Sequence, residues 1–267
     1  MMKQRKWMAL LLTIAMSMSI ATGCGALDDA GVDQNDKFTN SAASEQSVEA
    51  AEEAVNNDRT VDIAATADVF VPEQVPSYTG AAFTVVHDNV PYFAESDLTT
   101  ESYETYAPLD NLGRCGVAMA CVGQDLMPTE KRGSIGMIRP SGWQTARYDD
   151  LISTKYLYNR CHLIAYSLAG ENANERNLIT GTRYMNENMI PYENEVAAYV
   201  QETDGHVLYR VTPVFEGKNL LASGVEIEAM SVEDCGRSVA FHVFLYNAQP
   251  GVGIDYATGE NWRAAEA

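Results

Sequence analysis

The chain has 267 residues and a formal net charge of −19 at pH 7. No internal repeat is visible, and after the first twenty residues no apolar stretch is long enough to span a membrane, which excludes solenoids and multispanning membrane proteins. A charge this negative also excludes a surface that is basic throughout. Contact with a polyanion would need a local basic patch.

The first residues have the pattern of an export signal. Three basic residues among the first six precede an apolar run over residues 7–20, which is short for a membrane span. Small residues then lead to Cys24. We expect residues 1–24 to be a lipoprotein signal peptide, with Cys24 lipidated and the protein anchored at the extracellular face of the cell membrane. An ordinary signal peptide and a secreted protein are the alternative.

Residues 25–77 are polar and acidic, with twelve acidic side chains against Lys37 and Arg59. Low hydrophobicity combined with high net charge cannot offset the loss of chain entropy on folding. We therefore predict an acidic disordered linker, in which residues 44–55 could form a short exposed helix.

Residues 78–267 are long enough for one domain with its own core. Alternating hydrophobic residues predict an opening hairpin over residues 80–95, turning at Asp88-Asn89. Small apolar residues predict a buried strand over residues 114–122. The flanking residues 103–113 and 124–145 are predicted to be loops.

The next part of the chain predicts strands at residues 156–162 and 177–180 and then a helix over residues 183–202. Buried positions of that helix recur at helical spacing, and Pro191 is expected to break or kink it because proline lacks an amide donor. Further strands are predicted at residues 206–216, 223–231, 238–247 and 253–256. Strands that follow one another, with one main helix, indicate an α+β fold with an antiparallel sheet core.

Residues 131–183 form a basic window, with eight basic side chains against four acidic ones. Such a patch can attract a polyanion to an otherwise acidic body, although ordinary solvated surface charge would give the same composition.

Four cysteines follow Cys24, and an even number in an exported protein allows disulfides in three connectivities. Cys115 and Cys121 would lie about 20 Å apart on one extended strand, so they are poorly placed to pair. A zinc site is the competing use of such cysteines, but no CxxC or HxxxH spacing supports it.

His162 differs from the other histidines because polar side chains surround it in sequence. Asn159 and Arg160 precede it, and several asparagines follow before the predicted helix. His206 and His242 lie in predicted strands and are expected to be structural or exposed.

The segments PSGWQT, YLYNRCHLIAY, GENANERNLITGTRYMN and YRVTPVFEG, all within residues 110–260, resemble the DNA/RNA non-specific endonucleases of the ββα-metal (His-Me finger) type, in their secreted and surface bacterial branch. The family signature Asp-Arg-Gly-His stands here as Asn-Arg-Cys-His. Asn159 removes a carboxylate, which puts its orienting role in doubt, and Cys161 adds a side chain beside the histidine.

The resemblance implies that His162 is the general base that deprotonates water, and that Asn186 is a ligand of Mg²⁺, with Mn²⁺ as an alternative. The reaction would be metal-dependent hydrolysis of phosphodiester bonds in DNA, with RNA as a second substrate, giving 5′-phosphate ends.

The same resemblance implies that Arg160 contacts the phosphate and that Arg183 binds substrate. Asn177 would hold the metal-site loop or a metal-bound water, and Glu193 would accept hydrogen bonds from metal-bound waters. From the residues alone, Asn177 could be a turn residue, Asn186 a helix-surface residue and Arg183 a solvated charge.

A non-catalytic surface lipoprotein that binds DNA is the alternative function. A toxin exported against rival cells is a third reading, which would need a delivery module and an immunity partner. No protein partner is evident from the sequence.

Overall fold

The computed structural model describes Pro72 and residues 75–265. The predicted signal peptide, Cys24 and all of the predicted linker except Pro72 and residues 75–77 lie outside these described residues. Among the described residues, no helix is long and apolar enough to cross a membrane.

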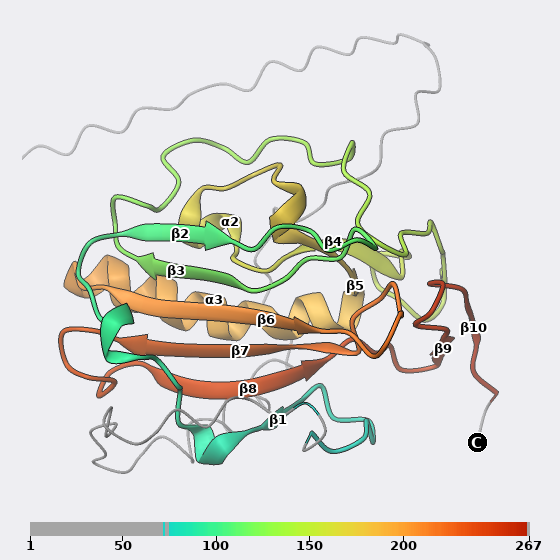
Figure 1. Ribbon diagram of the computed structural model, residues 1–267. Coiled ribbons are helices and arrows are strands. Elements are labelled where there is room, and N and C mark those ends of the chain that lie inside the picture. Colours follow the sequence, from blue (N-terminus) through green and yellow to red (C-terminus); the bar gives the residue numbers. More distant parts are fainter. Residues whose placement is uncertain (1–71, 73–74, 266–267) are drawn as a thin grey trace, which may run out of the picture. The chain divides into compact units, whose positions relative to one another are not determined.

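Six antiparallel strands form the main sheet, in the order β1-β8-β7-β6-β3-β2 (Figure 1). Their bounds are β1 Phe83–Val85, β2 Tyr103–Tyr106, β3 Ala118–Val122, β6 Val207–Val214, β7 Gly224–Ser231 and β8 Ala240–Tyr246. Two hairpins stand outside the sheet: β4 Tyr158–His162 with β5 Leu178–Thr182, and β9 Val252–Ile254 with β10 Asn261–Arg263. The predicted α+β fold with an antiparallel core is confirmed.

One face of the sheet carries the main core. The helix α3 (Arg183–Thr203) runs along this face, as Figure 1 shows. Alternate residues of β6, β7 and β8 point to this face because side chains of a strand alternate between its two sides. They meet the apolar stripe of α3, which consists of Met185, Met189, Tyr192, Val196 and Val200.

The other face of the sheet is covered by residues 86–98, which include the short 3₁₀ turns η2 (His87–Asn89) and η3 (Glu95–Asp97). The predicted hairpin over residues 80–95 is wrong, because β1 pairs with β8 and not with the residues that follow it. All three residues of η2 have positive φ values, between 49° and 64°. This left-handed turn carries the chain across the sheet instead of back along β1.

Three further predictions need correction. β2 lies within a predicted loop, and α2 (Tyr166–Ala169), η4 (Glu175–Asn177) and β10 were not foreseen. Pro191 does not break the helix, since α3 is continuous over 21 residues. Proline removes one helical hydrogen bond, but the buried residues on both sides of it keep the helix packed on the sheet.

The four cysteines of the described residues are free thiols. Cys115, Cys121 and Cys161 are buried, and Cys235 is exposed. Burial raises the pKa of Cys115 and of Cys121 to about 11. These two buried thiols are therefore packing residues and not reactive groups.

Candidate active site on the β4–β5–α3 unit

The β4–β5 hairpin leads into α3 without a connecting loop. Thr182 ends β5 and caps the helix, because its Oγ1 accepts a hydrogen bond of 3.0 Å from the backbone N–H of Met185. Gly181 allows the helix to approach closely: a Cβ atom there would lie 2.3 Å from Sγ of Cys161 and 2.6 Å from Cε of Met185. Two strands and one helix thus form a compact ββα unit.

The helix brings Glu193 toward the strand that carries His162. Cys161 is the neighbour of His162 on β4, and its thiol feels the charges of Glu193, Arg183 and Arg132. Glu193 therefore lies near the end of the hairpin where His162 pairs with Leu178.

His162 is 7% exposed, and both of its ring nitrogens have neighbours. Nε2 lies 2.8 Å from the backbone carbonyl oxygen of Asn172, and Nδ1 lies 3.2 Å from Nη2 of Arg132. A carbonyl oxygen can only accept, so Nε2 carries the proton. In the neutral ring Nδ1 therefore holds the lone pair, as a general base requires.

Arg132 is a site residue that the sequence did not reveal. It lies thirty residues before His162, in an irregular segment, and only the fold brings its guanidinium to the imidazole. Its Nε is buried and has no hydrogen-bond partner among the described residues. Its membership of the basic window at residues 131–183 was the only signal available.

Glu193 places a carboxyl group close to this arginine. Burial raises the pKa of Glu193 to about 7, and the charge of Arg132 lowers it in part. The carboxyl group can therefore exchange a proton near neutral pH, which is unusual for a glutamate and typical of functional sites.

Asn177 is fully buried and holds the chain that follows His162. Its Oδ1 accepts a hydrogen bond of 2.8 Å from the N–H of Ile164, and its Nδ2 donates one of 2.9 Å to the carbonyl of Ile164. Of the two roles expected for this residue, the structure therefore shows contact with the loop.

Asn186 lies in the second turn of α3 and is partly exposed. Its side chain makes no hydrogen bond to the described residues, so the amide oxygen is available to a ligand. Nearby on α3, Nε of Arg183 pairs with Oε1 of Glu187 at 2.8 Å. The structure places the predicted substrate residue Arg183 in an ion pair at the start of the helix.

The residues of this unit offer the kind of donor that suits a hard divalent cation. They are the amide oxygen of Asn186, the carboxyl group of Glu193, and Oδ1 of Asn172, which is buried without a partner among the described residues. Oxygen donors with room for water are what Mg²⁺ prefers.

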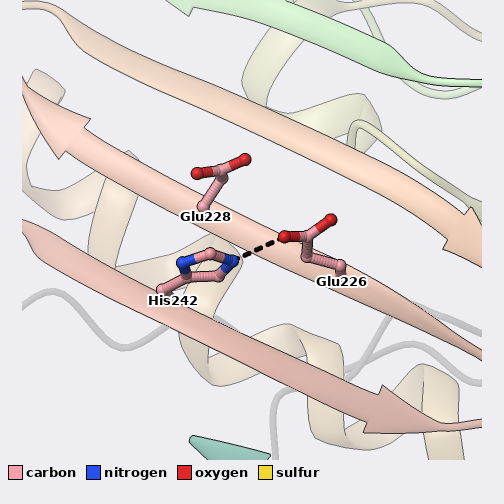
Figure 2. Close-up of side chains that lie close together, drawn as sticks. All are labelled: Glu226, Glu228 and His242. Atoms are coloured by element: carbon pink, nitrogen blue, oxygen red, sulfur yellow. Dashed lines mark hydrogen bonds and ion pairs between the residues drawn. The ribbon is translucent and has the colours of Figure 1, made fainter. Parts of the chain in front are cut away.

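A second polar cluster lies on the opposite face of the sheet and consists of Glu226, Glu228 and His242 (Figure 2). One potential ligand atom from each lies within 4.8 Å of the others. Nε2 of His242 is 2.5 Å from Oε1 of Glu226. Glu228 accepts hydrogen bonds from Nε of Arg210, at 2.6 Å, and from the N–H of Tyr92, at 2.7 Å.

The same cluster holds the segment that crosses this face. Nδ1 of His242 lies 2.8 Å from the carbonyl oxygen of Val90, the N–H of His242 donates to Oδ1 of Asn89, and Arg210 donates to the carbonyl of Tyr92. The positive charge of Arg210 on Glu228 opposes a second cation there. We interpret the cluster as a buried ion-pair network that docks residues 89–92.

Comparisons with known proteins find nucleases of similar fold. The NucA protein of Streptococcus agalactiae, solved with a magnesium ion bound, is 25% identical, with a TM-score of 0.60; the alignment covers 68% of this chain and 87% of NucA. The Sda1 nuclease, solved with a bound zinc ion, is also 25% identical, with a TM-score of 0.56 and coverage of 68% and 96%. No curated protein sequence matches this chain.

The sequence profile described as DNA/RNA non-specific endonuclease matches residues 94–233, which is more than half of the chain. This stretch contains β4, β5 and α3 with His162, Arg132, Asn186 and Glu193. The chain is therefore an endonuclease and belongs to the DNA/RNA non-specific endonuclease family.

Proposed function

We propose that this endonuclease hydrolyses phosphodiester bonds of DNA, and of RNA as a second substrate, with His162 as general base and Mg²⁺ as cofactor. The observation that carries the proposal is the fixed tautomer of His162, whose Nε2–H faces the carbonyl of Asn172 and whose Nδ1 lone pair faces Arg132. NucA, which is similar over two thirds of this chain, was solved with magnesium. Mn²⁺ is the alternative metal.

In the proposed reaction Nδ1 of His162 takes a proton from water, and the resulting hydroxide attacks phosphorus. The bond between phosphorus and the 3′ oxygen breaks, the 3′ oxygen takes up a proton from water and leaves as a hydroxyl, and the phosphate stays on the 5′ end of the product. The backbone carbonyl of Asn172 holds the ring in place throughout, because it accepts a hydrogen bond from Nε2–H both before and after Nδ1 takes the proton from water. Asn177 fixes the chain that follows His162 through its two hydrogen bonds to the backbone of Ile164.

Asn186 and Glu193 are the residues that would hold the metal, Asn186 directly and Glu193 through water. A bound divalent cation would stabilise the negative charge that develops on the phosphate oxygens and on the leaving oxygen.

Arg132 is the cation best placed to contact the scissile phosphate, because its Nη2 already lies at the base. Arg183 would contact a neighbouring phosphate once it leaves Glu187. Contacts to phosphates carry no base information, which agrees with cleavage of any sequence.

We also propose that the enzyme is exported and anchored through lipidated Cys24 at the extracellular face of the cell membrane. A basic start, an apolar run and small residues before the cysteine support this proposal. Secretion after cleavage at an ordinary signal peptide is the alternative.

The central test is plasmid cleavage by wild type and by His162→Ala in the presence of Mg²⁺. We expect the substitution to lower kcat by about 10²–10⁴-fold, the usual contribution of a general base, and EDTA to abolish cleavage by wild type. His206→Ala is the matched control, because His206 directly precedes β6, outside the ββα unit, and has Glu233 as its partner.

Equal cleavage by wild type and His162→Ala would contradict the proposed mechanism. A wild-type domain that binds DNA in a salt-dependent manner, but does not cut it whichever divalent metal is added, would favour the non-catalytic binding protein.

A further inference from the structure

Arg160 lies two residues before His162 on β4, so the two side chains share one face of the strand. Its guanidinium is nevertheless turned to protein groups. Nε donates to the carbonyl of Ile138 at 2.5 Å, and Nη2 donates to the carbonyl of Gly136 at 2.9 Å. Its Cζ lies 4.1 Å from the ring centroid of Trp143, a distance typical of cation–π contact.

The residues in these three contacts belong to one irregular segment, residues 132–143, which also contains Arg132. This segment has no strand or helix of its own, so its backbone carbonyls need donors from elsewhere. Arg160 supplies two of them. A phosphate contact by the same two N–H groups would leave these carbonyls unpaired.

The far end of the segment is fixed to other parts of the molecule. Oγ1 of Thr180 donates to the carbonyl of Ser141 at 2.8 Å, and Oγ of Ser141 donates to the carbonyl of Leu220 at 2.6 Å. Gly142 has φ +65°, and a Cβ atom there would lie 2.1 Å from Leu221. The middle of the segment therefore depends on Arg160 and Trp143 for its position.

We infer that Arg160 and Trp143 are a positioning pair: they fix residues 136–143 and thereby place Arg132 against Nδ1 of His162. Arg160 acts through this segment and not on the phosphate. The inference rests on the proposed function for its kinetic consequences, whereas the contact between Arg160 and the segment is independent of it.

The test compares Arg160→Lys and Trp143→Leu, alone and together, with wild type. Lysine keeps the charge but lacks the planar fork that reaches two carbonyls. Leucine removes the ring on which the guanidinium stacks. We expect each single variant to lower kcat by up to about 10²-fold, because small displacements of reacting groups have effects of this size. KM and its salt dependence should stay close to wild type.

The double variant should be no slower than the slower single variant, since both changes release the same segment. Trp143→Phe should restore most of the activity lost in Trp143→Leu, because it keeps an aromatic face. Phe215→Leu is the matched control: it removes the ring 4.8 Å from Cζ of Arg114, in a pair that does not touch the segment.

Trypsin digestion of the folded proteins gives a readout that does not need activity. Lys131 and Arg132 are cleavage sites next to and within the segment, and Lys131 is exposed; the bond after Arg139 resists trypsin because Pro140 follows it. Both Arg160→Lys and Trp143→Leu should accelerate cleavage there, at unchanged melting temperature. Arg160→Lys should fold in any case, because it preserves length and charge.

Unchanged trypsin cleavage in both variants would overturn the inference. So would a raised KM with unchanged kcat in Arg160→Lys, since that result belongs to a lost phosphate contact. A wild-type protein that cuts no nucleic acid would instead refute the proposed function, and the trypsin result would still decide whether the pair fixes the segment.

Discussion

Glu193 carries its carboxyl group into the ββα unit, where burial raises its pKa from 4.5 to about 7. A carboxyl group whose pKa is raised on folding binds its proton more tightly in the folded state. The folded protein therefore loses stability as pH rises from about 4.5 to about 7, because the partly desolvated site disfavours the charged form. A carboxylate that lowers the stability of the folded protein is expected at this position if it helps to hold a cation.

We predict that Glu193→Gln stabilises the metal-free protein above pH 7 and changes little near pH 5, since glutamine has no charge to bury. Urea unfolding in EDTA at about pH 5 and about pH 8 measures this difference. Glu202→Gln, at an exposed position of the same helix, should give no such pH dependence. Equal stability of wild type and Glu193→Gln at high pH would show that the carboxylate is well solvated.

The sequence identified several residues of the site, but it did not identify the residues that contact them in the folded protein. His162, Asn177 and Asn186 were identified because their spacing matches a family signature within a stretch of 25 residues. Arg132 was not identified, because the contact with His162 spans an irregular segment whose path no local pattern describes.

Among the elements, β7 and β8 carry the buried charges that hold residues 89–92 against the sheet. Glu228 is 2% exposed, and its removal would leave Arg210 and the N–H of Tyr92 without their carboxylate. We predict that Glu228→Ala lowers the free energy of unfolding by about 3–5 kcal/mol, the usual effect of breaking a buried pair. Urea unfolding measures it.

Asp149→Ala is the control for this prediction, because it breaks an exposed pair with Arg147 and should cost less than about 1 kcal/mol. The kcat of folded Glu228→Ala should match wild type, since the cluster lies on the sheet face opposite α3. If Zn²⁺ raised the melting temperature of wild type but not of Glu228→Ala, the cluster would be a metal site and not an ion-pair network.

Element types were easier to predict than their partners. Periodic burial in α3, β6, β7 and β8 is visible as spacing in the sequence, and these elements were predicted within a few residues of their observed bounds. The hairpin at residues 80–95 failed because alternation reports one buried face and not the identity of the pairing strand.

In the whole molecule, the family profile ends at residue 233, but the sheet continues through β8 and β1. We predict that a fragment of residues 75–265 folds and cuts DNA like the full chain. A fragment of residues 94–233 should not fold, because it exposes the edge of β7 that pairs with β8 in the full sheet and lacks the core residues of β8. Circular dichroism and plasmid cleavage compare the two fragments.

The full chain adds the predicted anchor to this domain. Full-length protein should appear in the membrane fraction of the producing cells, whereas Cys24→Ser and the fragment of residues 75–265 should not. If Cys24→Ser stayed in the membrane fraction, something other than a lipid on that cysteine would hold the protein there.

The sequence by itself determined the fold class, the family and the histidine at the centre of the proposed chemistry, because these depend on short-range spacing and on the kinds of side chain present. The tertiary structure decided that Arg132 meets His162, that Arg160 faces carbonyls, and that residues 89–92 rest on a buried charge network. Each of these contacts joins segments far apart in the chain, and such contacts depend on how whole elements pack and not on the local pattern of residues.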